Sequence, residues 1–196
     1  AGRKAVSWVL RRPVFWALVL AFIAYAGAFS ALTFHLYPLL LERGLTPAGV
    51  VTVMAVIGPA QVAGRLLVWA FAPHAPVRTV GALVVAVFPL SVLGFALAPP
   101  DVLTITAIAA AYGVANGILT IVRGLAVPEM LSREAYGAIN GAMAAPVHLV
   151  HAVTPMAAAW LWAASGGYDA VLTAILVGAC ILTASFWAAT WLSRRG

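Results

Sequence analysis

The sequence predicts an all-α membrane protein with six transmembrane helices. Of its 196 residues, 64% are hydrophobic and only 8% are charged, whereas about a quarter of an ordinary soluble domain is charged. The mean hydropathy is +1.06, and a soluble chain of this composition would lack the polar residues to cover its core. The apolar residues gather in six runs, each at least as long as the roughly 20 residues that cross a bilayer.

The apolar runs set the expected domain organisation. A basic cytoplasmic segment, residues 1–13, precedes a six-helix bundle over residues 14–192, and a short cytoplasmic tail, residues 193–196, follows it. The first run continues well beyond the length of a signal-peptide core, so we expect a span there. Because the connections are short, consecutive spans are expected to be antiparallel neighbours. The expected spans are residues 14–41, 50–72, 77–98, 102–127, 137–164 and 170–192.

The charges predict which side of the membrane each end occupies. With six spans, eight basic residues fall on the side of the two termini, and Arg43 alone falls on the other side. Cytoplasmic loops of membrane proteins carry the excess of arginine and lysine, so both termini are expected in the cytoplasm, with the bacterial inner membrane as the location. The net charge of +6 therefore reports topology, and no nucleic-acid partner is expected.

An internal similarity indicates two copies of one unit. The segment from Leu32 aligns with the segment from Leu119 when small gaps are allowed, and Met54 then matches Met143 while Pro59 matches Pro146. Since each unit holds three spans, the second copy is expected to be inverted in the membrane. Inverted three-helix repeats are typical of transporters, which bind their substrates near the midplane between the repeats.

Polar side chains inside the spans concentrate in four of the six helices. An arginine at the centre of a membrane helix costs about 2.5–3.5 kcal/mol, so such positions are informative. The third and sixth spans are poor in polar residues and are expected to be peripheral. At helical spacing, the other four carry polar faces expected to line a cavity: His35 in the first span; Gln61 and Arg65 in the second; Asn116, Thr120 and Arg123 in the fourth; Asn140, His148 and His151 in the fifth.

Arg65 carries most of the expected chemistry. No carboxylate lies deep in a span, so the permanently charged guanidinium of Arg65 needs an anion from elsewhere or an anionic substrate. Arg123 lies near the end of its span and is interpreted as reaching the headgroup layer. The expected substrate-binding residues are Arg65, Gln61, His148, His151, Asn116, Asn140 and His35. For the two asparagines and His35, a structural hydrogen bond between helices is the alternative role.

Metal binding and intramembrane hydrolysis are two other chemistries that these residue types allow. His148 and His151 lack a third ligand for a metal, so no metal site and no cofactor are expected. Ser165-Gly166-Gly167 resembles part of the nucleophile motif of rhomboid-type intramembrane proteases, but it lies in a loop and a GxSG motif is absent. We therefore expect no enzyme and no catalytic residues, and a six-span hydrolase or a non-transporting scaffold remains as an alternative.

The polar distribution resembles the carboxyl-terminal half of a major facilitator superfamily transporter, in which the third and sixth spans of that half are peripheral. The stretch GRLLVWAFAPHAPVR resembles the loop motif between the second and third spans of that half, with Val68 and Trp69 where its acidic residue would stand. QVAGR also resembles the cavity-facing arginine segment of oxalate and monocarboxylate porters, although Gln61 replaces their usual aspartate.

The resemblance implies half of a twelve-span fold with the substrate between two halves. We therefore expect a secondary active transporter, in the manner of a symporter, that moves a small organic anion such as a carboxylate by alternating access. Its expected partners are that anion, protons as a candidate coupling ion, the lipid bilayer, and either a missing amino-terminal half or a second copy of the chain.

Overall fold

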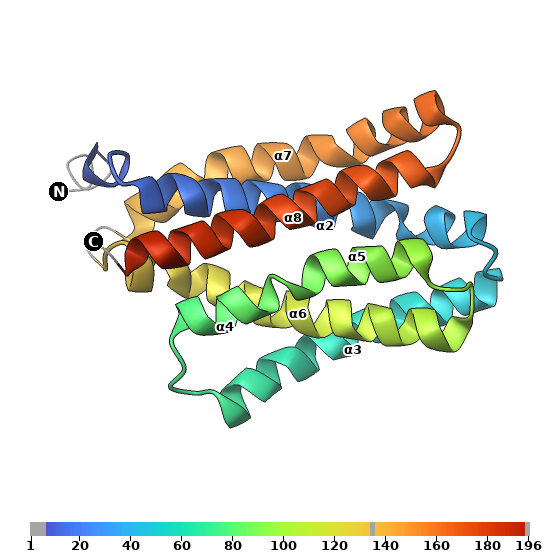
Figure 1. Cartoon of the computed structure of the whole chain (residues 1–196), viewed down its shortest axis with the longest axis horizontal. Coiled ribbons are helices and arrows are strands. Elements are labelled where there is room, and N and C mark those ends of the chain that lie inside the picture. Colours follow the sequence, from blue (N-terminus) through green and yellow to red (C-terminus); the bar gives the residue numbers. More distant parts are fainter. Residues whose placement is uncertain (1–6, 134–135, 195–196) are drawn as a thin grey trace.

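The computed structural model describes residues 7–133 and 136–194, and this part of the chain is helical without any strand. Six helices in it are long and apolar enough to cross a membrane, which confirms the predicted all-α membrane fold class. Each predicted boundary lies within three residues of the observed one. The helices are α2 (Pro13–Glu42), α3 (Pro47–Phe71), α4 (Val77–Val84), α5 (Val87–Leu97), α6 (Val102–Met130), α7 (Tyr136–Ser165) and α8 (Tyr168–Ser193), with α4 and α5 forming one span (Figure 1).

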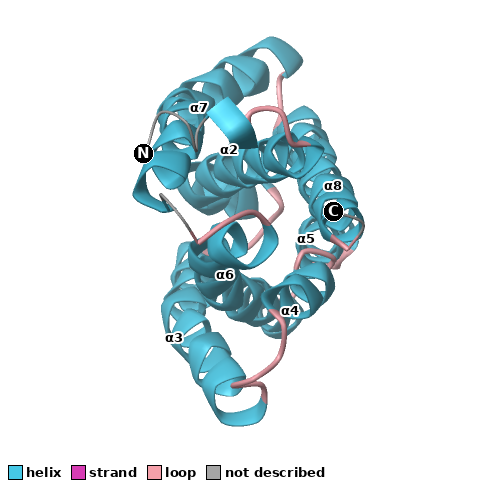
Figure 2. Cartoon of the chain, turned by 90° about the vertical axis from the view of Figure 1, so that its left-hand side faces the viewer, coloured by secondary structure: helices cyan, strands magenta, loops and turns pink. Residues whose placement is uncertain are grey.

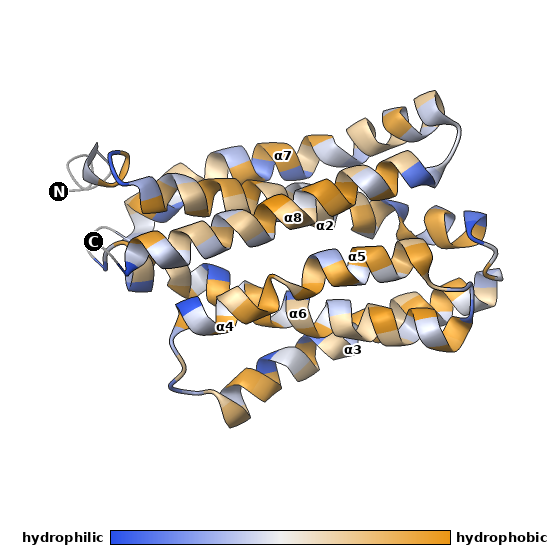
Figure 3. Ribbon diagram, viewed as in Figure 1, coloured by the Kyte–Doolittle hydropathy of each residue, from blue (hydrophilic) through white to orange (hydrophobic). Residues whose placement is uncertain are grey.

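The helices run back and forth along the long axis, so that both chain ends lie at the same end of the bundle (Figure 1). We call this end the basic end, because it carries Arg11, Arg12, Arg78, Arg133 and Arg194. Hydrophobic residues line every helix, and strongly hydrophilic ones gather near the helix ends (Figure 3). Long apolar helices with polar ends fit an integral membrane protein.

The closest helix pairs are not consecutive in the sequence, which corrects the expectation that consecutive spans are neighbours. Helix α3 packs mainly against α6, and α2 packs mainly against α8 and α7. The span formed by α4 and α5 packs against α6 and α8. Viewed along the bundle, α2, α7 and α8 form one group, and α3, α4, α5 and α6 form the other (Figure 2).

Small residues explain why α3 and α6 approach so closely. A Cβ built on Gly64 would overlap the backbone of Val114, and one built on Gly117 would overlap the backbone of Gln61. A Cβ on Gly113 would lie 2.8 Å from the carbonyl oxygen of Ile57. Glycines at such crossings let two helix backbones pack in contact.

Prolines inside the helices leave carbonyl groups without their helical N–H partner, and hydroxyl groups from other segments bond three of them. Pro155 frees the carbonyl of His151, which accepts a 2.7 Å hydrogen bond from the Ser30 hydroxyl of α2. Pro89 frees the carbonyl of Val85, which accepts a 2.8 Å bond from Thr183 of α8. The Thr183 hydroxyl also lies 3.0 Å from the carbonyl of Ala179 in its own helix. In the same way, Pro128 frees the carbonyl of Gly124, which accepts a bond from Tyr136.

Burial differs from the expectation that the third and sixth spans are the peripheral ones. The least buried spans are α7, with 17% of its most apolar window inside the protein, and α3, with 22%. The third and sixth spans reach 39% each, because α5 and α8 pack against one another. Two of the helices that carry polar faces, α3 and α7, are thus the ones that this chain itself covers least, whereas α6, which also carries one, is 50% buried.

Candidate functional site

A hollow of about 300 Å³ with a largely polar lining lies between α2, α6 and α7. Helix α6 contributes Thr120, Arg123 and Gly124, and α7 contributes Asn140 and His148. Apolar side chains complete the wall: Phe22, Met143, Ala144 and Val147. Two helices, α6 and α7, thus bring one cation, one imidazole, one amide and one hydroxyl to a common space.

The hollow extends from near the basic end toward the middle of the bundle. Asn140 lies one helical turn into α7, and Arg123 lies seven residues, or about 10 Å, before Met130 at the end of α6. His148 lies twelve residues into α7, which corresponds to about 18 Å along the helix axis. Since a hydrocarbon core is about 30 Å thick, His148 marks the depth of a bilayer midplane.

Arg123 is half-buried at the wall of this hollow, with its guanidinium carbon 5.9 Å from the centre of the Phe22 ring. A guanidinium over an aromatic face is attracted to it, and that attraction grows as water is excluded. Arg123 thus lines the cavity, whereas the sequence predicted that its side chain reaches the headgroup layer.

Three of the four described carboxylates accept hydrogen bonds elsewhere, and the fourth, Asp169, lies in the first turn of α8 at the end of the bundle opposite the basic end. Glu129 accepts from the backbone N–H groups of Val77 (2.7 Å) and Arg78 (3.1 Å), where it caps α4. Glu42, at the opposite end of the bundle, accepts from the Trp162 indole and the Tyr168 backbone. Asp101 caps the start of α6. The hollow therefore presents a cation without a carboxylate among the described residues.

Asn116 does not open into this hollow. It is 2% exposed, and its amide oxygen accepts a hydrogen bond from the Tyr25 hydroxyl of α2. Such a bond joins two helices inside the bundle. The structural role that we gave as the alternative for Asn116 is the one that its geometry supports.

Gln61 and Arg65 lie on α3, away from the hollow. Arg65 is exposed and lines a different groove, formed by α3, α4 and α6. Gln61 is half-buried, and its backbone lies at the α3–α6 contact. The structure therefore separates Arg65 from His148, because the polar face of α3 points to the side of α6 that is opposite the hollow.

The two remaining predicted histidines also lie outside the hollow. His151 is exposed on α7, one turn beyond His148, and its ring stacks on Phe29 with 6.2 Å between ring centres. His35 bonds the Tyr168 hydroxyl at 2.9 Å and the Pro155 carbonyl at 3.0 Å. Because a carbonyl only accepts, Nε2 of His35 carries the proton, and Nδ1 accepts from Tyr168. His35 is therefore a helix-to-helix contact at the end opposite the basic end.

Thr120, Arg123 and Phe22 are not among the substrate-binding residues predicted from the sequence, although Thr120 and Arg123 do belong to a polar face that was expected to line a cavity. Phe22 is an apolar residue in an apolar helix, and nothing in the sequence distinguishes it from its neighbours.

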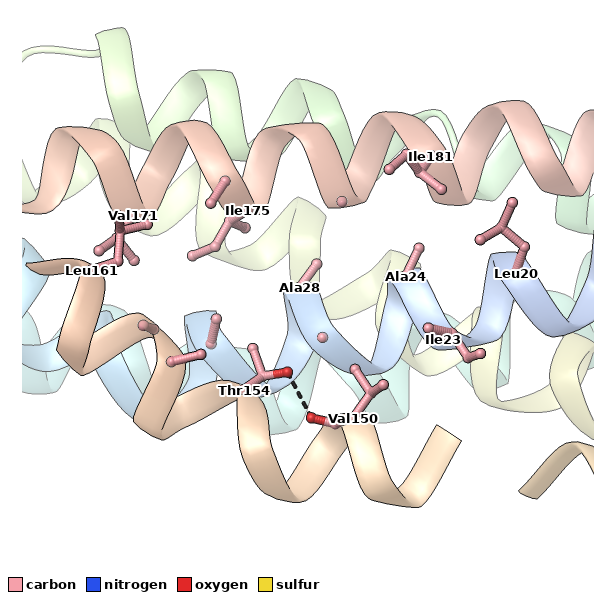
Figure 4. Close-up of a pocket in the computed structure, with 16 residues that line it drawn as sticks. Leu20, Ile23, Ala24, Ala28, Val150, Thr154, Leu161, Val171, Ile175 and Ile181 are labelled. Atoms are coloured by element: carbon pink, nitrogen blue, oxygen red, sulfur yellow. Dashed lines mark hydrogen bonds between the residues drawn. The ribbon is translucent and has the colours of Figure 1, made fainter. Parts of the chain in front are cut away.

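A second cavity, of about 310 Å³, is almost wholly apolar and lies between α2, α7 and α8 (Figure 4). Thr154 is its one polar side chain, and its hydroxyl donates to the carbonyl of Val150 at 2.6 Å. The floor is formed by small residues such as Gly27 and Ala28 of α2. This cavity offers no group that could orient a polar solute.

The residues of the hydrolase and metal alternatives are not arranged as sites in the described part of the chain. The Ser165 hydroxyl donates to the carbonyl of Leu161 at 2.8 Å, within its own helix. Within residues 7–133 and 136–194, no group of three or more histidine, cysteine or acidic side chains could hold a metal ion. A search of protein-family models and of curated proteins found no match to this sequence.

Proposed function

We propose that this chain is one six-helix half of a secondary active transporter for a small organic anion, of the kind found in the major facilitator superfamily. The observation that carries the proposal is the hollow at Arg123. It holds a half-buried guanidinium without a carboxylate partner among the described residues, beside an amide and an imidazole. A desolvated guanidinium binds carboxylates through two parallel charged hydrogen bonds.

The pairing of the helices supports two inverted repeats within this half. The first span packs on the fifth and sixth, just as the fourth packs on the second and third, while the third and sixth pack on each other. The same set of helix pairs results if spans one, two and three are renumbered as four, five and six, and the reverse. Two inverted three-span repeats have this symmetry of helix pairs, and transporters built from them bind their substrates near the interface of the two repeats.

In the proposed site, Arg123 binds the anionic group of the substrate. Asn140 donates hydrogen bonds to its remaining oxygen atoms, while the Thr120 hydroxyl donates to the Gly117 carbonyl at 2.7 Å. His148, at the deep end, donates a hydrogen bond to the substrate or accepts a proton, since an imidazole can do both. Proton binding at His148 would then couple the anion to a proton gradient, as in a symporter.

The exposed polar face of α7 favours a second helix bundle as partner. Asn140, His148 and His151 are all exposed in this chain, and such residues seldom face lipid. We propose that the missing amino-terminal half of a twelve-span transporter, or a second copy of this chain, covers that face and closes the hollow. Alternating access would then expose the hollow to either side in turn.

The excess of arginine at the basic end supports a cytoplasmic location for that end and for both termini. A bacterial inner membrane is the proposed location. A hollow that opens near the basic end would then be reached first from the cytoplasm.

Binding of simple carboxylates to the purified chain tests this proposal. Acetate, lactate, oxalate and succinate would be titrated into the detergent-solubilised protein by calorimetry, and uptake of the best ligand into proteoliposomes would follow. We expect one of these anions to bind, and Arg123→Gln to weaken its binding by about 10- to 100-fold, since a hydrogen bond to a charged group contributes about 1.5–3 kcal/mol.

Arg194→Gln is the matched control, because it removes the same charge at the basic end from an exposed residue at the end of α8. Its carboxylate affinity should equal that of the unaltered protein. Equal weakening by both substitutions would show a general charge effect, and failure of all four anions to bind would remove the organic-anion assignment.

A further inference from the structure

Helix α3 carries a cation on a side that this chain leaves open. The helix lies at the rim of the bundle and contacts mainly α6 (Figure 2). Arg65 is exposed there, in a groove of about 260 Å³ between α3, α4 and α6. It is the single charged residue of the groove, and the other lining residues are apolar: Val68, Trp69, Ala72, Pro73, Ala75, Val77, Val80, Ile118, Ile121, Val122 and Leu125.

The packing of α3 on α6 places Arg65 deep in the membrane. Two contacts set the register of these helices: Gly64 with Val114, and Gln61 with Gly117. Arg65 is therefore level with Ile118, which lies two residues from the midpoint of the 29-residue α6 and about 18 Å from the end of that helix. Since half of a hydrocarbon core is about 15 Å thick, the backbone of Arg65 lies near the bilayer midplane, where no headgroup lies.

Arg65 has no ionic partner in the part of the chain that the structure describes. No hydrogen bond or ion pair joins its side chain to another described residue. Ionisable side chains inside membranes almost always pair with one another or face the interior of a bundle. A guanidinium does not lose its proton in a protein, so it cannot avoid the charge by titration. The negative charge that balances Arg65 must therefore come from outside this chain.

A second copy of the chain would not supply that charge. The sequence holds five acidic residues, and the four that the structure describes lie within one residue of a helix end: Glu42, Asp101, Glu129 and Asp169. The fifth, Glu134, lies outside the described residues, in the sequence between α6 and α7. A symmetric pair of chains would thus bring none of the described carboxylates to the depth of Arg65.

This groove and the hollow lie on different sides of α6. Leu125 lines the groove, whereas Arg123 lines the hollow. At about 100° per residue, positions two residues apart differ by about 200° around the helix axis, so these side chains point in nearly opposite directions. A partner in the groove therefore leaves the hollow open, and the inference does not rest on the proposed transport function.

We propose that this face of α3 docks a transmembrane helix from outside this sequence, and that an aspartate or glutamate near the middle of that helix enters the groove and pairs with Arg65. A guanidinium offers a carboxylate two parallel charged hydrogen bonds. The apolar lining excludes water from the pair, which strengthens the attraction. Gln61 lies one turn from Arg65 on the same face of α3, so its amide can donate a further hydrogen bond to the carboxylate. The partner is thus an acidic membrane helix.

Designed transmembrane peptides test the proposal. Helices of leucine and alanine, identical except for a central aspartate, asparagine or leucine, would be titrated in phosphatidylcholine vesicles against the chain labelled at Cys180, its one cysteine. Energy transfer to a labelled peptide gives each affinity, and a central residue lies at the same depth in either orientation of the peptide. We expect the aspartate peptide to bind about 5- to 30-fold more tightly than the leucine peptide, as one hydrogen bond between membrane helices would give.

Three variants locate the interaction. Arg65→Gln should bind the aspartate and asparagine peptides equally, with an unchanged circular dichroism spectrum. Arg65→Glu should reverse the preference, so that a peptide with a central lysine binds more tightly than the aspartate peptide. Arg123→Gln removes the cation of the hollow and should keep the preference of the unaltered protein for the aspartate peptide.

Three results would overturn the proposal. Equal affinities of the aspartate and leucine peptides for the unaltered protein would show that Arg65 does not select an acidic helix. Loss of the preference in Arg123→Gln, with its retention in Arg65→Gln, would place the acidic helix at the hollow. Association of differently labelled copies of the chain that Arg65→Gln abolishes would show that a second copy covers the groove.

Discussion

The contact between α3 and α6 leads to a sharp stability prediction, because α3 carries two glycines in different surroundings. A Cβ on Gly64 would lie 3.0 Å from the Cα of Val114 and would overlap that residue's carbonyl group, whereas a Cβ on Gly58 would meet nothing within 4 Å. Both lie in the interior of one helix. Replacing either glycine with alanine gives the same gain in helix propensity, about 0.5–1 kcal/mol.

The difference between the two variants therefore isolates the overlap at the helix crossing. Forcing an extra methyl group into a well-packed contact costs about 1–3 kcal/mol. Gly64→Ala should be destabilised by about 0.5–2 kcal/mol after the propensity gain is subtracted. Gly58→Ala should be stabilised by about 0.5–1 kcal/mol.

Denaturant titration of the two variants in detergent micelles, followed by circular dichroism, gives the comparison directly. The free energies of unfolding should differ by about 1–3 kcal/mol. If Gly64→Ala is as stable as Gly58→Ala, then α3 and α6 are not in backbone contact at this position, and the arrangement of the helices described above is incorrect.

Two further predictions concern hydrogen bonds. Thr183→Val keeps the side-chain shape but removes the hydrogen bond between helices to the Val85 carbonyl, which then keeps only the 3.4 Å bond from the Phe88 N–H, so we expect the free energy of unfolding to fall by about 0.5–1.5 kcal/mol. Thr190→Val, whose hydroxyl bonds only Phe186 of its own helix, should lose less than this, and equal losses would contradict the explanation. The pKa of Asp101 is held below its usual range by hydrogen bonds from the backbone N–H and the hydroxyl of Thr104. The ionised carboxylate should therefore stabilise the fold above the unfolded-state pKa, and this stabilisation should be lost as the pH falls through the folded-state pKa. The stability of Asp101→Ala should depend less on acid below about pH 4, whereas identical pH profiles of the two proteins would exclude this role.

The spans could be predicted because length and hydropathy are local properties of the sequence. Which helices pack together could not, because helix pairing depends on the shapes of two surfaces. Gly64 and Gly117 fit one another's helices across the α3–α6 crossing, although 53 residues separate them in the sequence. Neither glycine by itself shows which helix it packs against.

The site could be predicted only in part for a related reason. Helical spacing shows which residues share a face, and it correctly grouped Thr120 with Arg123 and Asn140 with His148. Spacing does not show where a face points. Arg65 belongs to a clear polar stripe, yet the rotation of α3 turns that stripe toward α4 and away from α7.

The two acceptors of Thr183 have a consequence for motion within the bundle. If α8 slides or tilts away from the third span, the hydroxyl can rotate to the Ala179 carbonyl, which already lies within bonding distance. The hydroxyl exchanges one acceptor for another and is never left without a partner in a medium that lacks water. The Val85 carbonyl would then keep only the 3.4 Å bond from the Phe88 N–H, so such a displacement leaves the donor fully paired and weakens the pairing of the acceptor alone.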